Sequence, residues 1–178
     1  PAKPWNPEEF KEEINKLSYR YHINHPLDNH FMEGKATKEL MKSWVANRFY
    51  YQSIIPRKDS AILSNCPEQS VRQKWILNVL DHDNTGEGID LWIDFAKTIG
   101  LTEEELLSHQ HVLPGVKFAC DAYYNFAKNA DYKIAIASCL TINYAGDIHK
   151  SRVDNWPKHY DWLNNESYVY FRDRMSKV

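Results

Sequence analysis

The chain has 178 residues, of which 43% are hydrophobic and 26% charged, a balance that is typical of one soluble globular domain. A formal net charge of −2 and the lack of a long apolar run exclude a basic nucleic-acid binder and a membrane-spanning protein, and no signal peptide is visible. Three widely spaced cysteines without a CxxC pair argue against a disulfide framework and favour a reduced, cytoplasmic setting.

The N-terminal part of the chain carries two strong helix signals. Asn6 is an N-cap residue followed by a proline and two acids, and apolar residues continue at helical spacing to Tyr21. This first helix is predicted to stop before Pro26, because the residue before a proline disfavours helical geometry. Thr37 is predicted to cap a second helix, which meets Pro56.

The rest of the chain alternates turn residues with helical stretches, and period-two alternation is scarce. The further predicted helices are one opened by Pro67-Glu68-Gln69, one over 89–99 that ends at Gly100, a short one capped by Thr102 and Glu105, two over roughly 116–130 and 132–155, the second bent at Gly146, and a last one that includes 168–175. The sequence therefore predicts an all-α, single-domain helical bundle over residues 1–178.

The motifs of several enzyme classes are missing. There is no GxGxxG or P-loop sequence for a nucleotide, and no GxSxG elbow for a hydrolase. A Glu-x-x-His pair, which helical di-iron carboxylate proteins use to place two ligands on one face, is missing too. A helical metal oxidase therefore loses support, although His22, His82 and His149 can still meet in space.

The stretch WVANRFYYQSIIPRKD, residues 44–59, places polar side chains on an apolar helix face. Its helical stripe consists of Trp44, Arg48, Tyr51, Gln52 and Ile55. A purely structural helix keeps arginine and glutamine off such a stripe, so either this face is not the core or the core contains a polar site. Arg48 can also extend to solvent, which would leave the aromatic residues as plain core.

Other histidines, tyrosines and arginines recur at helical spacing. His82 lies between two acids and can transfer protons, or it is a histidine favoured near a helix C-terminus. His149 and Arg152 are three residues apart, and Tyr170 and Arg174 are four apart, so each pair can face one way. Each residue alone is more often structural than catalytic. Several buried arginines would together indicate an anionic ligand, because an unpaired buried charge is costly.

Long motifs in a fixed order carry a family resemblance. RYHINHP, WVANRFYYQ-x-x-IP-x-KD, LDHD, HVLPGV-x-FA-x-DAY-x-NFA, IH-x-SR, WP-x-HY and YFR-x-R together resemble the pyrroloquinoline-quinone synthase family. The resemblance spans nearly the whole chain and implies a heme-oxygenase-like helical bundle that is usually a homodimer. Family members continue beyond the position of Val178, so we expect this chain to lack the family's last helices.

The resemblance also implies a chemistry. The family closes a ring on a small polyanionic quinone precursor and oxidises it to pyrroloquinoline quinone. It uses O2 as co-substrate and releases hydrogen peroxide, without a metal or an organic cofactor. The protein then needs only to hold the substrate, move protons and admit oxygen. Arginines suit the carboxylates of such a precursor because they bind carboxylates bidentately.

Roles for individual residues follow from the same resemblance, in which His82 corresponds to the proposed general base. Catalytic roles are implied for His82, His22, His149, Tyr170 and Arg174. Substrate contacts are implied for Tyr21, Arg48, Gln52, Lys58, Tyr123, Thr141 and Arg152. No metal ligand is implied.

The chain departs from the family pattern at two positions close in sequence to these site residues. Asn78 stands where an arginine precedes the histidine of LDHD, and Ile142 stands where a glutamate follows Thr141. Three functions therefore remain open: the oxidase, a non-catalytic or impaired relative that binds the precursor or product, and, less favoured, a metal-dependent oxygenase on the same scaffold. Ile142 argues against the last, since it removes a carboxylate that a metal would use.

Overall fold

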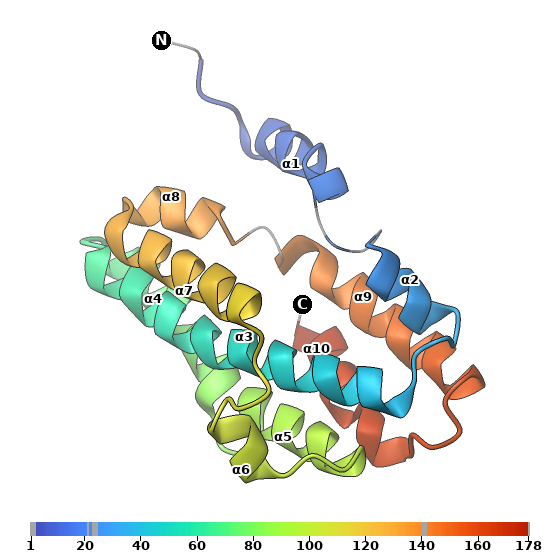
Figure 1. The fold of residues 1–178 in the computed structure, drawn as a ribbon. Helices are drawn as coiled ribbons and strands as arrows, with labels where there is room; N and C mark the ends of the chain where they lie inside the picture. The colour runs from blue at the N-terminus through green and yellow to red at the C-terminus, as the bar shows by residue number, and fades with distance from the viewer. Residues whose placement is uncertain (1–2, 21, 23–24, 140–141, 178) are drawn as a thin grey trace.

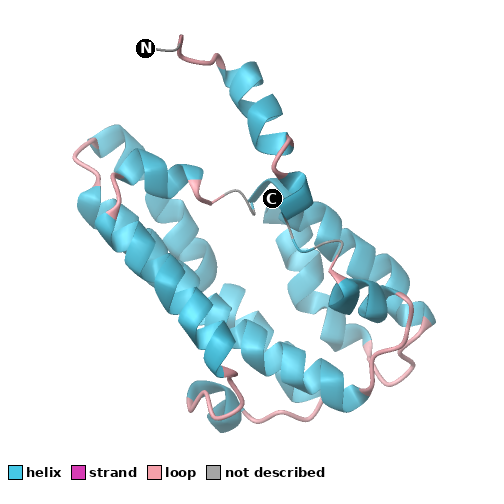
Figure 2. Cartoon of the chain, turned by 45° about the horizontal axis from the view of Figure 1, so that its top comes forward, coloured by secondary structure: helices cyan, strands magenta, loops and turns pink. Residues whose placement is uncertain are grey.

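A computed structural model describes residues 3–20, 22, 25–139 and 142–177. These residues form helices and loops, with no strand among them (Figure 1, Figure 2). The elements are α1 (Pro7–Asn15), η1 (Ser18–Arg20), α2 (Pro26–Met32), α3 (Lys38–Asn65), α4 (Gln69–Asp83), α5 (Gly88–Thr98), α6 (Glu103–Leu107), α7 (Pro114–Asn129), α8 (Tyr132–Ala137), α9 (Ile142–Asn155), η3 (Trp156–Lys158), η4 (Asn165–Tyr168) and α10 (Val169–Lys177). The all-α prediction is confirmed, and the expectation of a single domain stays a prediction.

The long helix α3 is the central element. Thr37 caps it as predicted, because its hydroxyl accepts a hydrogen bond from the Leu40 N–H at 3.1 Å. α3 packs against α7 and α4 and also contacts α5, α6 and α8, while α9 packs on α10. Figure 1 shows α4, α7 and α8 toward one end of α3, and α2, α9 and α10 toward the other.

Pro56 does not end this helix, which continues to Asn65. A proline lacks the N–H that would donate to the carbonyl four residues earlier, here that of Gln52. Pro56 is buried together with Ile54 and Lys58, so tertiary packing of this segment outweighs the local cost. The continuation matters for the site because it keeps Lys58 and Asp59 on the same rigid helix as Arg48.

The main hydrophobic core lies where α2, α3, α5, α9 and α10 meet. Trp92 and Trp156 are fully buried in it. The Trp44 ring contacts both edge-on, with centroid distances of 5.4 Å to Trp92 and 5.9 Å to Trp156. Edge contacts at such distances are a favoured arrangement of aromatic rings. Trp44 therefore packs against the core, and the polar residues of its stripe lie beside that core.

The first helix is shorter than predicted, since α1 ends at Asn15 rather than near Tyr21. None of its residues is buried, and Phe10 of its apolar stripe is 43% exposed. Most helices in proteins are stabilised by a packed apolar face, whereas no residue of α1 is fully buried among the described residues. The prediction followed the spacing of the stripe, which does not reveal whether a partner covers it.

The helix predicted over 132–155 is also wrong, because α8 and α9 are separate. The Ser138 hydroxyl donates to the Ala135 carbonyl, and the Cys139 N–H donates to the Ile136 carbonyl. Such local bonds compete with the helical ladder and end α8. Gly146, where a bend was expected, lies inside α9, and the bend itself stays a prediction.

Candidate active site

A pocket of about 320 Å³ opens between α3, α9 and the segment that leads into α2. It is lined by His22, His25, Leu27, Asp28, Trp44, Arg48, Ile148, His149 and Arg152. Histidines and arginines make up most of its polar groups, and Asp28 is the one carboxylate among these lining residues. The pocket therefore suits an anionic ligand better than a cationic one.

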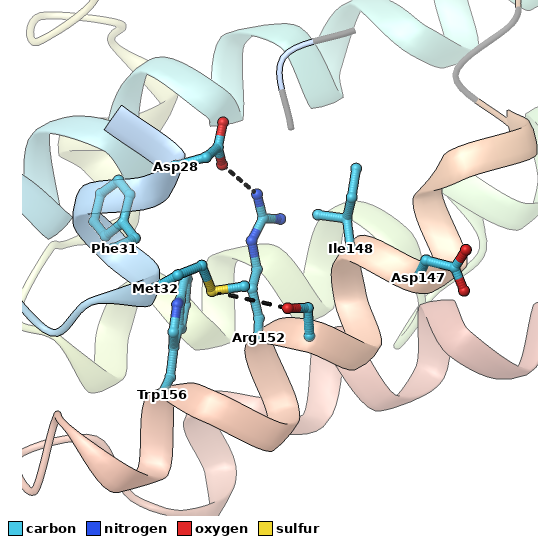
Figure 3. Close-up of a pocket in the computed structure, with 8 residues that line it drawn as sticks. Asp28, Phe31, Met32, Asp147, Ile148, Arg152 and Trp156 are labelled. Carbon is cyan, nitrogen blue, oxygen red and sulfur yellow. Dashed lines mark hydrogen bonds and ion pairs between the residues drawn. The ribbon is translucent and has the colours of Figure 1, made fainter. Parts of the chain in front are cut away.

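Arg152 of α9 is one of two guanidinium groups that line this pocket. The residue is 5% exposed, its Nη2 donates to Asp28 Oδ1 at 3.3 Å, and its Cζ lies 4.9 Å from the centre of the Trp44 ring. Figure 3 shows the side chain extending from α9 to the Asp28 carboxylate on α2. Burial lowers the pKa of Arg152 to about 10, with Arg48 adding to this and Asp28 opposing it. Arg152 thus remains charged at neutral pH.

His149 lies one helical turn before Arg152 and is also buried. Its Nδ1 has no hydrogen-bond partner among the described residues. Burial, with the positive charges of Arg152, Arg48 and Arg174, lowers the pKa of His149 to about 2. The ring is therefore a neutral imidazole at neutral pH; it lines the pocket, while its unpaired Nδ1 atom is itself buried.

Gln52 and Tyr170 are joined in the protein interior. The Gln52 Nε2 donates to the Tyr170 hydroxyl, and the two residues are 2% and 3% exposed. The Tyr170 ring meets the His149 ring edge-on, with centroids 5.7 Å apart. Burial raises the pKa of Tyr170, although the neighbouring arginines oppose this, so its hydroxyl keeps its proton at neutral pH. Gln52 of α3 thus provides a hydrogen-bond donor to the buried hydroxyl group of Tyr170 on α10.

His82, near the end of α4, is held by its own helix. Its Nδ1 lies 3.0 Å from the carbonyl oxygen of Asn78. A carbonyl can only accept a hydrogen bond, so Nδ1 carries the hydrogen and Nε2 is the acceptor of the neutral ring. Burial lowers the pKa of His82, which keeps the ring neutral at neutral pH. A neutral ring with a defined acceptor nitrogen is what a general base requires.

The positive charge of Arg174 on α10 acts on both His82 and His149. Its Nη1 donates to the carboxylate of Asp81, the neighbour of His82. Burial would raise the pKa of Asp81, but the bond and charge of Arg174 outweigh it and hold the pKa below its usual value. Arg174 also lowers the pKa values of both His82 and His149. Both rings therefore lie within electrostatic range of one guanidinium group.

Lys58 lies in a separate buried cluster further along α3. Its Nζ is 2.7 Å from Asp59 Oδ1 and 3.1 Å from the Cys139 sulfur, to which the Tyr123 hydroxyl also donates at 3.3 Å. Burial alone would lower the pKa of Lys58, but its interactions with Asp59 and Cys139 raise it instead. Among the described residues, neither Lys58 nor Tyr123 lines the 320 Å³ pocket, so their predicted substrate contacts stay predictions.

Comparison with known proteins covers nearly the whole chain. A family model described as the TENA/THI-4/PQQC family matches residues 12–178. The chain belongs to the TENA/THI-4/PQQC family. The pyrroloquinoline-quinone synthase of Klebsiella pneumoniae (strain 342) is 48% identical over 176 residues, which are 97% of this chain and 70% of that protein.

Two further relatives carry the same name. The pyrroloquinoline-quinone synthase of Ectopseudomonas mendocina (strain ymp) is 49% identical over 175 residues, which are 97% of this chain and 70% of that protein. That of Pseudomonas putida (strain W619) is 48% identical over 180 residues, with 99% and 72% covered. The resemblance seen in the motifs is therefore confirmed, and the chain spans about 70% of the length of these relatives.

The motif-based site residues of this family member fall into three groups. One group lies in or beside the 320 Å³ pocket, here called the arginine-rich pocket because Arg48 and Arg152 line it. This group consists of His22, Arg48, Gln52, His149, Arg152, Tyr170 and Arg174. Lys58 and Tyr123 form the second cluster, with His82 within electrostatic range of its Asp59. Tyr21 and Thr141 lie outside the described residues.

Sequence reasoning missed Asp28, the carboxylate that contacts two of the predicted site residues. The first predicted helix stopped before Pro26, and nothing was predicted to follow it until Thr37. In the structure Pro26 is the first residue of α2, a favoured position for proline, and Asp28 lies in the first turn. Pro26 with Asp28 two residues later is a pattern typical of a helix start, and it could have predicted α2.

Proposed function

We propose that this protein is an oxidoreductase of pyrroloquinoline quinone biosynthesis that closes the last ring of a polyanionic quinone precursor and oxidises it. The names of its relatives support the biosynthetic role and the enzyme class. The finer proposal is supported by three arginines, Arg48, Arg152 and Arg174, which together act on one buried neutral histidine, His149. A cluster of guanidinium groups suits a small ligand with several carboxylates.

In this proposal the chain's own residues bind the precursor and move its protons. His82 accepts a proton at Nε2, because Nδ1 is bound to the Asn78 carbonyl. Tyr170 keeps its hydroxyl hydrogen and can donate it to an oxygen atom of the reacting molecule. Each oxidation step moves two electrons and two protons from the precursor ring to O2, which leaves as hydrogen peroxide. The scheme uses no resident metal or organic cofactor.

The decisive experiment is incubation of the pure protein with the precursor in air. We expect the absorbance of the quinone to rise and hydrogen peroxide to accumulate, and both to depend on oxygen. An anaerobic incubation is the control, because it leaves precursor binding intact and removes the electron acceptor. Product formation at an equal rate without oxygen would contradict the proposed oxidase.

A second candidate is a relative that binds the precursor or product without turning it over. Asn78 favours it, since an amide replaces a guanidinium group expected next to the proposed base. The same incubation separates the two functions: binding seen by calorimetry without any quinone formed would support the second. The metal-dependent oxygenase is tested by metal analysis of the pure protein. The described residues contain no group of three or more His, Cys, Asp or Glu side chains placed to hold a metal ion.

The proposal also includes a homodimer that works in the cytoplasm. None of the described helices is both long and apolar enough to cross a membrane. Light scattering over a range of protein concentrations tests the dimer, for which we expect twice the mass of one chain. A mass equal to one chain at all concentrations would contradict it.

A further inference from the structure

One carboxylate contacts two groups of the proposed active site. Asp28 Oδ2 lies 2.8 Å from His22 Nδ1, and Asp28 Oδ1 accepts from Arg152 Nη2 at 3.3 Å. The Asp28 side chain is 21% exposed. It lines the 320 Å³ pocket and also an adjoining pocket of about 260 Å³, shown in Figure 3. Asp28 thus joins His22, which the resemblance assigns a catalytic role, to Arg152, which it assigns a substrate contact.

The charge of Asp28 determines where His22 carries its hydrogen. Burial would raise the pKa of Asp28, but the contacts with His22 and Arg152 outweigh it and hold the pKa below its usual value. The carboxylate is therefore ionised at neutral pH and can only accept hydrogen bonds. His22 Nδ1 must then carry a hydrogen, which makes Nε2 the acceptor nitrogen of the neutral ring.

Asp28 is poorly suited to bind the substrate itself. A carboxylate repels the carboxylates of a polyanionic precursor, and its two oxygen atoms already face His22 and Arg152. What it can do is hold both groups in place before the substrate arrives, which removes the cost of ordering them during the reaction.

We propose that Asp28 is a positioning residue, which fixes the tautomer of His22 and the guanidinium group of Arg152 relative to each other. The inference rests on the proposed oxidase function. We therefore expect loss of the Asp28 carboxylate to lower the rate of oxidation more than the affinity for the precursor. For affinity, the less ordered Arg152 is offset by removal of a negative charge that repels the precursor.

The first test compares Asp28→Asn with Asp147→Asn. Asp147 of α9 is exposed, lines the 260 Å³ pocket but not the 320 Å³ pocket, and points away from Arg152 in Figure 3. We expect Asp28→Asn to slow single-turnover oxidation by about 10- to 100-fold, the loss found where a carboxylate that orients a metal-bound histidine is removed. Asp147→Asn should keep the wild-type rate, and Asp28→Glu should restore part of it. Equal rates for the two asparagine variants would overturn the proposal.

The second test does not depend on turnover. NMR of the ring nitrogens in histidine-labelled protein, with His22 assigned by His22→Gln, reports which nitrogen carries the hydrogen. We expect a protonated Nδ1 in the wild type and in Asp147→Asn, and a mixture of tautomers in Asp28→Asn. Unchanged His22 signals in Asp28→Asn would refute the positioning role. If the wild type binds the precursor but does not oxidise it, the oxidase function fails, and these signals alone decide whether Asp28 controls His22.

Discussion

Neighbouring groups set the charge states of the individual site residues. Arg152 and His149 are three residues apart on α9, and both are buried. The positive charge of Arg48 lowers the pKa values of both. The guanidinium keeps its proton, whereas the imidazole, with a much lower starting pKa, gives its proton up. The result is a positive pocket that contains a neutral histidine. A ligand with carboxylates would relieve the repulsion among the arginines, which gives such ligands an advantage over neutral ones.

His82 is predicted to be the principal proton-transfer group. His82→Ala should slow oxidation by about 10²- to 10⁴-fold while precursor affinity stays nearly constant, because a general base acts in the transition state. Its base form is the neutral ring, and burial holds the pKa of His82 below the usual value. The wild-type rate should therefore fall only below about pH 6.5, the ordinary histidine pKa.

Stopped-flow kinetics over a range of pH values checks this prediction, and His111→Ala is its control. His111 is exposed, and its Nε2 contacts Glu105 at 3.2 Å, outside the pocket. An unchanged rate in a folded His82→Ala protein would remove His82 from the mechanism.

Arg48 is predicted to contribute strongly to ligand affinity. Arg152 and Arg174 each pair with a carboxylate, whereas Arg48 makes no ion pair among the described residues and lies 4.2 Å from the centre of the Tyr51 ring. Arg48→Ala should weaken binding of pyrroloquinoline quinone by roughly 1.5–3 kcal/mol, the usual value of a hydrogen bond to a charged group.

Isothermal titration calorimetry measures this loss. Arg57→Ala is the matched control, since Arg57 lies on the same helix, is exposed and contacts the Tyr124 ring rather than the pocket. Affinities that are equal in the two variants would show that Arg48 does not contact the ligand.

At the scale of elements, two helix caps were predicted correctly, whereas several features that depend on packing were not. Thr37 caps α3, and Thr102 forms the predicted capping box with Glu105, because capping needs only residues a few positions apart. The end of α1 at Asn15 and the continuation of α3 through Pro56 depend on which faces are buried by distant elements. Single-sequence periodicity does not contain that information.

Gly88 connects the start of α5 to the proposed base. It has a φ of 41°, and a Cβ at this position would lie 2.4 Å from the carbonyl oxygen of His82 and 2.5 Å from its Cα. Gly88→Ala should therefore displace the His82 backbone and slow oxidation, besides lowering the free energy of unfolding by about 1–3 kcal/mol through backbone strain.

Gly86→Ala separates these two effects. Gly86 has a φ of 78° but nothing within 4 Å of an added Cβ, so its substitution brings strain without a clash. Urea unfolding should show a loss of stability in both variants, whereas the oxidation rate should fall in Gly88→Ala only. A rate loss shared equally by both would show that the close approach to His82 is unimportant.

Across the whole molecule, the motifs assigned residues to a site without indicating how those residues are arranged. Arg48 and Lys58 are ten positions apart on a continuous helix, which at 1.5 Å per residue separates their backbones by about 15 Å. The resemblance placed both in one substrate site, while the structure has Lys58 bound to Asp59 and Cys139 in its own cluster. Family likeness assigns residues to a function, but distances between them depend on where each helix begins and ends.

The buried charges also make the stability of the whole fold depend on pH. In the unfolded chain His149 would have an ordinary pKa near 6.5, whereas in the folded protein burial lowers it to about 2. Below about pH 6.5 the unfolded state therefore binds more protons than the folded state, and stability falls as pH falls. Asp28 and Asp81 have lowered pKa values, so their contributions are lost only at more acidic pH, below the ordinary carboxyl range.

The free energy of unfolding should therefore decrease by about 2 kcal/mol between about pH 7 and pH 5, with His149 as a main cause and His82 acting in the same direction. Urea unfolding at several pH values measures this slope. His149→Gln removes the titrating group and should flatten the slope, while His111→Gln, a change at an exposed position, should retain it. Equal slopes in the wild type and His149→Gln would mean that His149 can take up a proton without unfolding, so that the arginine-rich pocket is more open to water than its burial indicates.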